Sequence, residues 1–287
     1  MKNSHRESSR SRNMRRAFPR FIVPLSSHSM QFGVCTPVEQ SAAAKAAGWD
    51  FVEVRVDQFI LGLVPDEQWT GAAAAAAGSA LPIRAANVLV PPAVKITGPS
   101  VDRGQLERYM DTVVRRCAGI GITQLVFGSG GARNVPGGFD RNDARGQIID
   151  FLRMIAPMAQ SRGITIAIEH LNAMECNIIN SLDEAMTYVK ELNHPSIRCV
   201  FDTFHFWLNE EPMDSLRAAA PWVSHVHLAD VNRTAPGTTG RNDYRPVFAE
   251  LKRAGYRGAL SVEAVDFDLV PRGRAVLEYV KDLWETA

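Results

Sequence analysis

The chain has 287 residues, of which 46% are hydrophobic and 22% are charged, and its formal net charge is +1. This length and hydrophobic content suffice for one α/β barrel, which needs roughly 250 residues. A nearly neutral chain lacks the basic field that holds nucleic acid, so we expect a small-molecule partner and no nucleic acid.

The cysteines and the apolar runs indicate the compartment. Without CxxC spacing, a few scattered cysteines are typical of reduced thiols in a cytoplasmic protein. No apolar run reaches the roughly 18 residues of a membrane helix, so we expect no membrane partner. The cysteines are Cys35, Cys117, Cys176 and Cys199.

The first 29 residues differ from the rest because they are rich in Arg and Ser. We predict a flexible N-terminal extension over 1–29 and a catalytic barrel over 30–287. The pair Arg15-Arg16 resembles part of a twin-arginine export signal, but the apolar stretch that follows is short and interrupted by Pro19 and Pro24. An alternative is that translation starts later, at Met14 or Met30.

From Met30 onward, short β-rich runs alternate with helical patterns, as in repeated βα units with a parallel sheet. Thr36, Asp102 and Ser181 are predicted helix N-caps, and Gly48 is typical of a helix end. Eight such units predict a single-domain (β/α)8 TIM barrel. The predicted strands are 31–35, 51–56, 83–90, 123–128, 164–169, 197–202, 224–230 and 259–264.

An open doubly wound sheet also alternates strands and helices, and it is the competing fold. It fits less well, because no GxGxxG motif follows the first strand, where the sequence reads VCTPVEQ. Polar strand ends are also spread over the late strands instead of gathering at one switch point.

Acidic and imidazole side chains mark the ends of the last four predicted strands. They are Glu169, Asp202, His227 and Glu263, and they lie 33, 25 and 36 residues apart along the chain. Each spacing is close to one strand-helix-strand unit of roughly 30 residues, so a barrel would bring all four to one mouth. Oxygen ligands with a single nitrogen suit one divalent ion such as Mn²⁺, Mg²⁺ or Co²⁺ better than a structural Zn²⁺.

Strand alternation sends His225 and His227 to the same face, one deeper than the other. We choose His227 as the ligand because it lies nearer the strand end, with Asp230 as an acceptor that fixes its tautomer. A structural role for His225 is as well supported as a functional one.

Other polar residues at strand ends have two explanations. Glu53, Arg55 and Asn87 end the second and third strands and are candidates for the pocket wall, although a salt bridge at the core edge explains the first two equally well. The run Gly128–Arg133 offers backbone N–H groups and a guanidinium to a phosphate. No Gly-Lys-Ser/Thr follows it, which favours an active-site loop closing over a neutral sugar.

Several motifs in order resemble the xylose isomerase-like TIM-barrel family of sugar phosphate isomerases and epimerases. They are Glu169-x-x-Asn172-x-x-Glu175, Asp202-Thr203-Phe204-His205, His227 to Arg233 with Pro236-Gly237, and Ser261-Val262-Glu263. Within the family they most resemble the D-tagatose/D-psicose 3-epimerase branch. One departure is Ala173, where these epimerases often carry Arg, which puts the contacts to the far end of the sugar in doubt.

The resemblance implies that Glu169, Asp202, His227 and Glu263 bind one divalent ion, usually Mn²⁺, and that Glu169 and Glu263 also transfer protons. It implies that Glu175, His205 and Arg233 contact the oxygens of the sugar substrate near C1 to C3. A homodimer or homotetramer is expected from the same resemblance alone.

The chemistry expected of such a site is an isomerase reaction on a ketose through a cis-enediolate, with two Glu as proton-transfer groups. Returning the proton to the same carbon gives epimerisation, and returning it to the neighbouring carbon gives aldose-ketose isomerisation. A keto-inositol dehydratase and a hydroxypyruvate isomerase are the alternatives.

Two more distant functions are less well supported. An AP-endonuclease-like phosphodiesterase needs a histidine-rich zinc cluster, yet the chain has no His between His28 and His170. A non-catalytic sugar-binding barrel is disfavoured by the complete set of four ligands.

Overall fold

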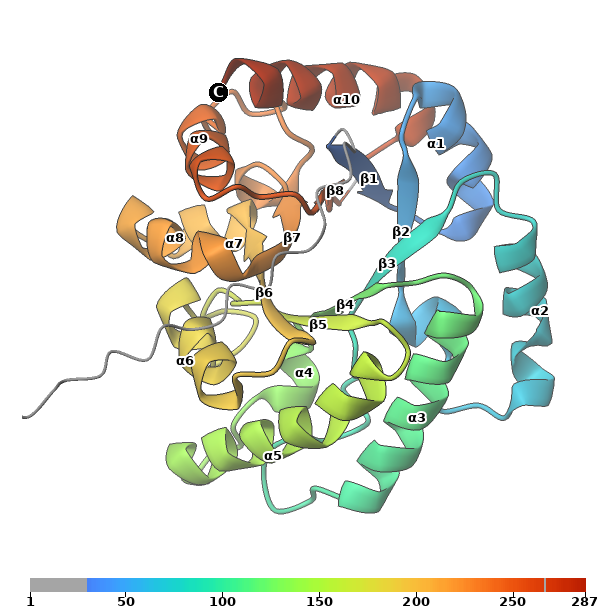
Figure 1. Cartoon of the computed structure of the whole chain (residues 1–287), viewed down its shortest axis with the longest axis vertical. Helices are drawn as coiled ribbons and strands as arrows, with labels where there is room; N and C mark the ends of the chain where they lie inside the picture. The colour runs from blue at the N-terminus through green and yellow to red at the C-terminus, as the bar shows by residue number, and fades with distance from the viewer. Residues whose placement is uncertain (1–29, 266) are drawn as a thin grey trace, which may run out of the picture.

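The computed structural model describes residues 30–265 and 267–287, and they form a closed barrel of parallel strands in the order β1 to β8 (Figure 1). The predicted (β/α)8 fold is therefore confirmed. The predicted extension over 1–29 lies outside the described residues. The strands are β1 (Gln31–Cys35), β2 (Phe51–Arg55), β3 (Ile83–Asn87), β4 (Gln124–Phe127), β5 (Thr165–Ile168), β6 (Ile197–Asp202), β7 (Val223–Leu228) and β8 (Ala259–Val262).

Helices surround the barrel and cover the outer face of the sheet (Figure 1). The α-helices are α1 (Ser41–Ala47), α2 (Asp66–Ala77), α3 (Arg103–Gly119), α4 (Gly130–Arg133), α5 (Arg141–Gln160), α6 (Leu182–Leu192), α7 (Thr203–Leu208), α8 (Met213–Ala219), α9 (Arg245–Arg253) and α10 (Leu269–Thr286). Shorter turns are η1 (Val38–Gln40), the π-helical η2 (Val56–Ile60), η3 (Ala220–Trp222) and η4 (Val231–Arg233). Within the part of the chain described, no helix combines the length and apolar character needed to cross a membrane.

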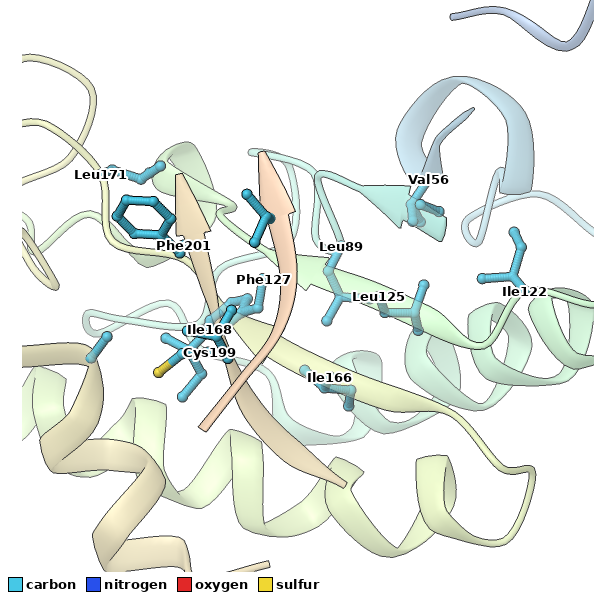
Figure 2. Close-up of a cluster of buried hydrophobic side chains, with 14 of the residues drawn as sticks. Val56, Leu89, Ile122, Leu125, Phe127, Ile166, Ile168, Leu171, Cys199 and Phe201 are labelled. Atoms are coloured by element: carbon cyan, nitrogen blue, oxygen red, sulfur yellow. The ribbon is translucent and has the colours of Figure 1, made fainter. Parts of the chain in front are cut away.

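Successive side chains of each strand alternate between two apolar layers, as the pleat requires. In β4, Leu125 and Phe127 belong to the large core between the sheet and the helices, whereas Val126 belongs to a separate small cluster with Ala167 and Val200. Paired residues of neighbouring strands point to the same face of the sheet, and Val200 of β6 is paired with His225 of β7. Since His225 contacts Glu53 of β2 across the barrel, the small cluster lies inside the barrel. Figure 2 shows part of the outer layer, including Leu125, Phe127, Ile166, Ile168, Cys199 and Phe201.

The helix caps agree with the sequence in part. Asp102 caps α3 by accepting from the N–H of Gln105 at 2.9 Å, and Gly48 ends α1 in the left-handed region at φ 99°. Ser181 caps α6 by accepting from the N–H of Glu184 at 3.0 Å. The predicted cap at Thr36 is wrong, because η1 begins after Pro37 without a side-chain cap.

Candidate metal centre

The four side chains at the ends of β5 to β8 meet at one mouth of the barrel. One ligand-type atom from each of Glu169, Asp202, His227 and Glu263 lies within 4.8 Å of the others. Nδ1 of His227 is 2.9 Å from Oε1 of Glu169, 3.4 Å from Oε2 of Glu263 and 3.7 Å from Oδ2 of Asp202. The first three side chains are buried, and Glu263 is 19% exposed. The cluster therefore opens outward beside Glu263.

The electrostatics of the cluster favour a cation. Burial acts to lower the pKa of His227, but the charges of Glu53 and Glu263 outweigh it and raise that pKa well above its usual value. Burial raises the pKa of Glu169. Burial acts likewise on Glu263, but the positive charges of His227 and Arg233 more than offset it and lower its pKa. Several carboxylates around one imidazole fit a bound divalent ion, and the donor set leaves the choice of metal open.

Glu53 is the polar contact of His227 that the sequence did not predict. Its buried carboxylate lies 2.9 Å from Nε2 of His227 through Oε1 and 2.8 Å from Nε2 of His225 through Oε2. Burial acts to raise the pKa of Glu53, but the two imidazoles outweigh it and hold that pKa well below its usual range. A second group of ligand-type atoms within 4.8 Å is thus formed by Cys35, Glu53 and His227.

Asp230 does not have the predicted role of fixing the His227 tautomer. Its carboxylate instead accepts from the hydroxyl of Tyr244 at 2.7 Å and from the N–H and hydroxyl of Thr239 at 2.8 and 2.9 Å. The N–H of Gly237 also donates to it at 3.3 Å. Asp230 therefore organises the loop after β7.

The three predicted substrate residues lie together beside the cluster. Nη2 of Arg233 is 2.8 Å from Nε2 of His205 and 3.5 Å from Oε2 of Glu175, and Nη1 is 3.7 Å from Oε2 of Glu263. Asn232 and Arg233 both have left-handed backbones, at φ 67° and 56°. Strained residues of this kind cluster at functional sites, and here they bring the guanidinium over the cluster.

Two cavities adjoin the cluster and share four wall residues. One has a volume of about 420 Å³ and the other about 170 Å³, and the second also reaches Glu169 and Glu175. The first alone falls within the roughly 300–1,000 Å³ typical of small-molecule sites. The shared wall residues are Arg55, Asn87, Arg233 and Glu263.

The pocket-wall candidates divide by their contacts. Asn87 donates from Nδ2 to Oε1 of Glu263 at 2.8 Å, which ties it to the cluster. Arg55 is exposed and pairs with Asp57 at 2.8 Å. Glu53 lies deeper in the barrel than Arg55, between His225 and His227. Of the two residues for which a salt bridge at the core edge was an alternative, Arg55 forms one and Glu53 does not.

Within the segment 128–133, residues 128–131 line the smaller cavity beside the cluster, whereas Arg133 has a structural role. Gly130–Arg133 is helix α4, and the buried guanidinium of Arg133 donates to the carbonyl oxygens of Phe127 at 2.6 Å and Glu169 at 2.7 Å. Arg133 therefore joins the ends of β4 and β5 and supports Glu169 from behind.

The comparisons with known proteins agree with this geometry. The family model described as "Xylose isomerase-like TIM barrel" matches residues 41–282. The chain belongs to this family. Solved structures share the fold, with a TM-score of 0.76 to a D-psicose 3-epimerase in the presence of D-fructose (18% identity, covering 89% of this chain and 99% of that one). The TM-score is 0.72 to a 3-keto-D-glucoside 4-epimerase from E. coli (21% identity, covering 88% and 100%).

Curated relatives match over part of their length. A D-psicose 3-epimerase of Agrobacterium fabrum is 32% identical over 121 residues, which are 42% of this chain and 41% of the relative. An L-ribulose 3-epimerase of Methylomonas sp. is 31% identical over 151 residues, 52% of each chain. The chain thus spans about half the length, or less, of these curated relatives.

Proposed function

We propose that the protein is a metal-dependent sugar epimerase or isomerase that acts on a ketose, with 3-epimerisation as the principal reaction. The observation that carries the proposal is the buried Glu169–Asp202–His227–Glu263 cluster, which opens onto a cavity of a size that suits a sugar. Relatives named D-psicose, L-ribulose and ketose 3-epimerase support the substrate class.

The four cluster residues fit one divalent ion, and Mn²⁺ is the ion we propose. When bound, it would supply Lewis-acid polarisation of the sugar carbonyl and the neighbouring hydroxyl. Glu175, His205 and Arg233 orient the substrate by hydrogen bonds to its oxygens near C1 to C3.

Proton transfer falls to the two glutamates of the cluster. One of Glu169 and Glu263 removes the proton from the carbon that bears the neighbouring hydroxyl, next to the carbonyl carbon, and leaves a cis-enediolate. The other returns a proton to that carbon from the opposite side, which inverts the centre. Removal of a proton from C1 of a 2-ketose and its return to C2 gives the aldose-ketose isomerase outcome instead.

Deuterium exchange tests the proposal. The Mn²⁺-loaded protein is incubated in D₂O with free ketoses, their phosphates, hydroxypyruvate and a keto-inositol, and each compound is followed by NMR. We expect deuterium beside the carbonyl of one ketose, with the exchange lost on chelation and in Glu263→Gln. Exchange in no compound by a protein that holds stoichiometric metal would contradict the proposal.

A keto-glycoside is a second substrate candidate for the same chemistry. One relative, 28% identical over 120 residues, is a 3-dehydro-D-guloside 4-epimerase of Escherichia coli. The larger cavity extends from Glu263 to Phe59 and Val38, which supply an apolar wall against which an aglycone would pack. Including a 3-keto-glucoside among the test compounds separates the two substrates.

A further inference from the structure

We propose that Glu53 is the positioning residue of the metal centre. It accepts a hydrogen bond from Nε2 of His227 and thereby directs Nδ1 of that ring toward the three carboxylates of the cluster. His225 holds Glu53 in this orientation. The inference rests on the metal site of the proposed function.

Among the residues that the structure describes, His225 and His227 are the hydrogen-bond partners of the Glu53 carboxylate. Its side chain is fully buried, and each carboxylate oxygen lies within 2.9 Å of a different imidazole nitrogen. The three carboxylates of the metal cluster lie on the other side of the His227 ring, around Nδ1. The ring is therefore held between one carboxylate behind it and three in front of it.

The tautomer follows from this arrangement. With a metal on Nδ1 the ring would be neutral and carry one N–H, and because a carboxylate can only accept, the contact with Glu53 places this hydrogen on Nε2. Nδ1 then presents its lone pair to the cluster, as a metal ligand must. A carboxylate on the far nitrogen also makes the ring a stronger donor.

His225 gains a role that the sequence left open between structure and function. Its ring lies edge-on to His227, with 5.1 Å between ring centroids and 83° between planes, one layer deeper in the barrel. By donating from Nε2 to Oε2 of Glu53, it fixes the second carboxylate oxygen and stops the group from rotating away from His227.

Cys35, Glu53 and His227 could also be considered a separate metal site, and the contacts argue against it. Both oxygens of Glu53 already lie at hydrogen-bond distance from imidazole nitrogens.

The test measures Mn²⁺ affinity by calorimetry, which does not depend on any substrate. Glu53→Gln keeps the shape but has no charge and only one acceptor oxygen for two N–H groups, so we expect about tenfold weaker binding. Glu53→Ala should weaken binding about 100-fold. The visible spectrum of the Co²⁺-loaded variants should change as well, because the imidazole ligand is no longer fixed.

Asp230→Asn is the matched control. Asp230 is also a buried acid after β7, but its partners belong to the loop that follows. We expect this variant to lose stability and to keep the wild-type Mn²⁺ affinity and Co²⁺ spectrum.

The outcomes separate the two proposals. If wild type binds Mn²⁺ and Glu53→Gln binds it equally well, the role of Glu53 is overturned and the metal site stands. Equal weakening in Glu53→Gln and Asp230→Asn would also overturn it, because any buried acid would then suffice. A wild-type protein that binds none of Mn²⁺, Mg²⁺ and Co²⁺ overturns both. Should Glu53→Ala fail to fold, the isosteric Glu53→Gln decides.

Discussion

Asn87 donates a hydrogen bond from Nδ2 to Oε1 of Glu263 over 2.8 Å, and so joins the end of β3 to the residue after β8. Both residues line both cavities beside the metal cluster. Since Glu263 is a proposed proton-transfer group, this contact sets the direction of its carboxylate.

Asn87→Ala should therefore impair the proton-transfer step more than sugar binding. We expect kcat for exchange to fall about tenfold with little change in KM, because a misdirected acid-base group loses part of its contribution. Gln58→Ala, an exposed residue on the wall of the larger cavity, is the control and should retain the wild-type kcat. A rise in KM without a loss of kcat would show that Asn87 binds the sugar instead.

Gly128→Ala should disturb the metal cluster. A Cβ at Gly128 would lie 2.2 Å from Oε2 of Glu169, so this carboxylate must leave its position. We expect Mn²⁺ binding to weaken about tenfold or more, measured by calorimetry. Gly137→Ala is the matched control, because no heavy atom of the described residues lies within 4 Å of its added Cβ. Equal affinity in both variants would contradict the placement of Glu169.

Arg116 stabilises the segment 58–66, which begins with Gln58 and Phe59 on the wall of the larger cavity. Its buried guanidinium donates to the carbonyl oxygens of Ile60, Leu61 and Val64 and pairs with Asp66 at 2.8 Å. Arg116→Met should lower the free energy of unfolding by about 3 kcal/mol, because three carbonyl oxygens lose their donor. Urea denaturation measures this loss.

Arg115 provides the control for Arg116. It pairs with the same Asp66 at 3.0 Å, but its side chain is 45% exposed. Arg115→Met should cost less than about 1 kcal/mol, as expected of a surface ion pair. Similar losses in both variants would show that the ion pair, and not the buried carbonyl contacts, holds the segment.

Glu211 should give stability a dependence on pH. Burial raises its pKa to about 7 in the folded protein, from an ordinary value of 4.5. Because the folded state binds this proton more tightly, the contribution of Glu211 is greatest below pH 4.5 and is lost as the pH rises to about 7. The carboxyl lies 3.2 Å from Nε2 of His170, whose pKa burial lowers to about 3, so that ring is neutral over the same range.

The measurement compares wild type with Glu211→Gln by urea denaturation at several pH values. The stability of wild type relative to the variant should fall between pH 4.5 and about 7. A constant difference across this range would mean that Glu211 ionises normally in the folded protein.

Strand periodicity predicted the barrel well, and it failed where the backbone leaves the strand. The third strand was expected to reach Val90 but ends at Asn87, because Val88 has a left-handed φ of 51° that a strand cannot contain. A β-branched residue rarely adopts this conformation, so no local pattern could have predicted it.

The cluster residues could be proposed from strand endings because parallel strands end at one mouth. The role of Glu53 could not, because β2 and β7 are not neighbours in the sheet and their side chains meet only across the barrel interior. The alternation of side chains along FVEVR does place Glu53 on the face of β2 that points away from Val52 and Val54, and these two valines pack in the core between the sheet and the helices. That pattern gives the direction of the side chain but not the histidine that it meets.

The metal cluster and most of the larger cavity wall come from different halves of the chain. The four cluster residues lie at or next to the carboxyl ends of β5 to β8. Much of the wall of the larger cavity comes instead from the ends of β1, β2 and β3 and from the segments that follow β1 and β2. Substitutions at wall residues such as Gln58 and Phe59 can thus change the shape of the larger cavity without touching the four cluster residues, whereas Glu53 and Asn87 contact His227 and Glu263 directly. New preferences for a ligand can therefore be selected in the segments after β1 and β2, provided that Glu53 and Asn87 are retained, and exchanged half-barrels must carry these two residues with them.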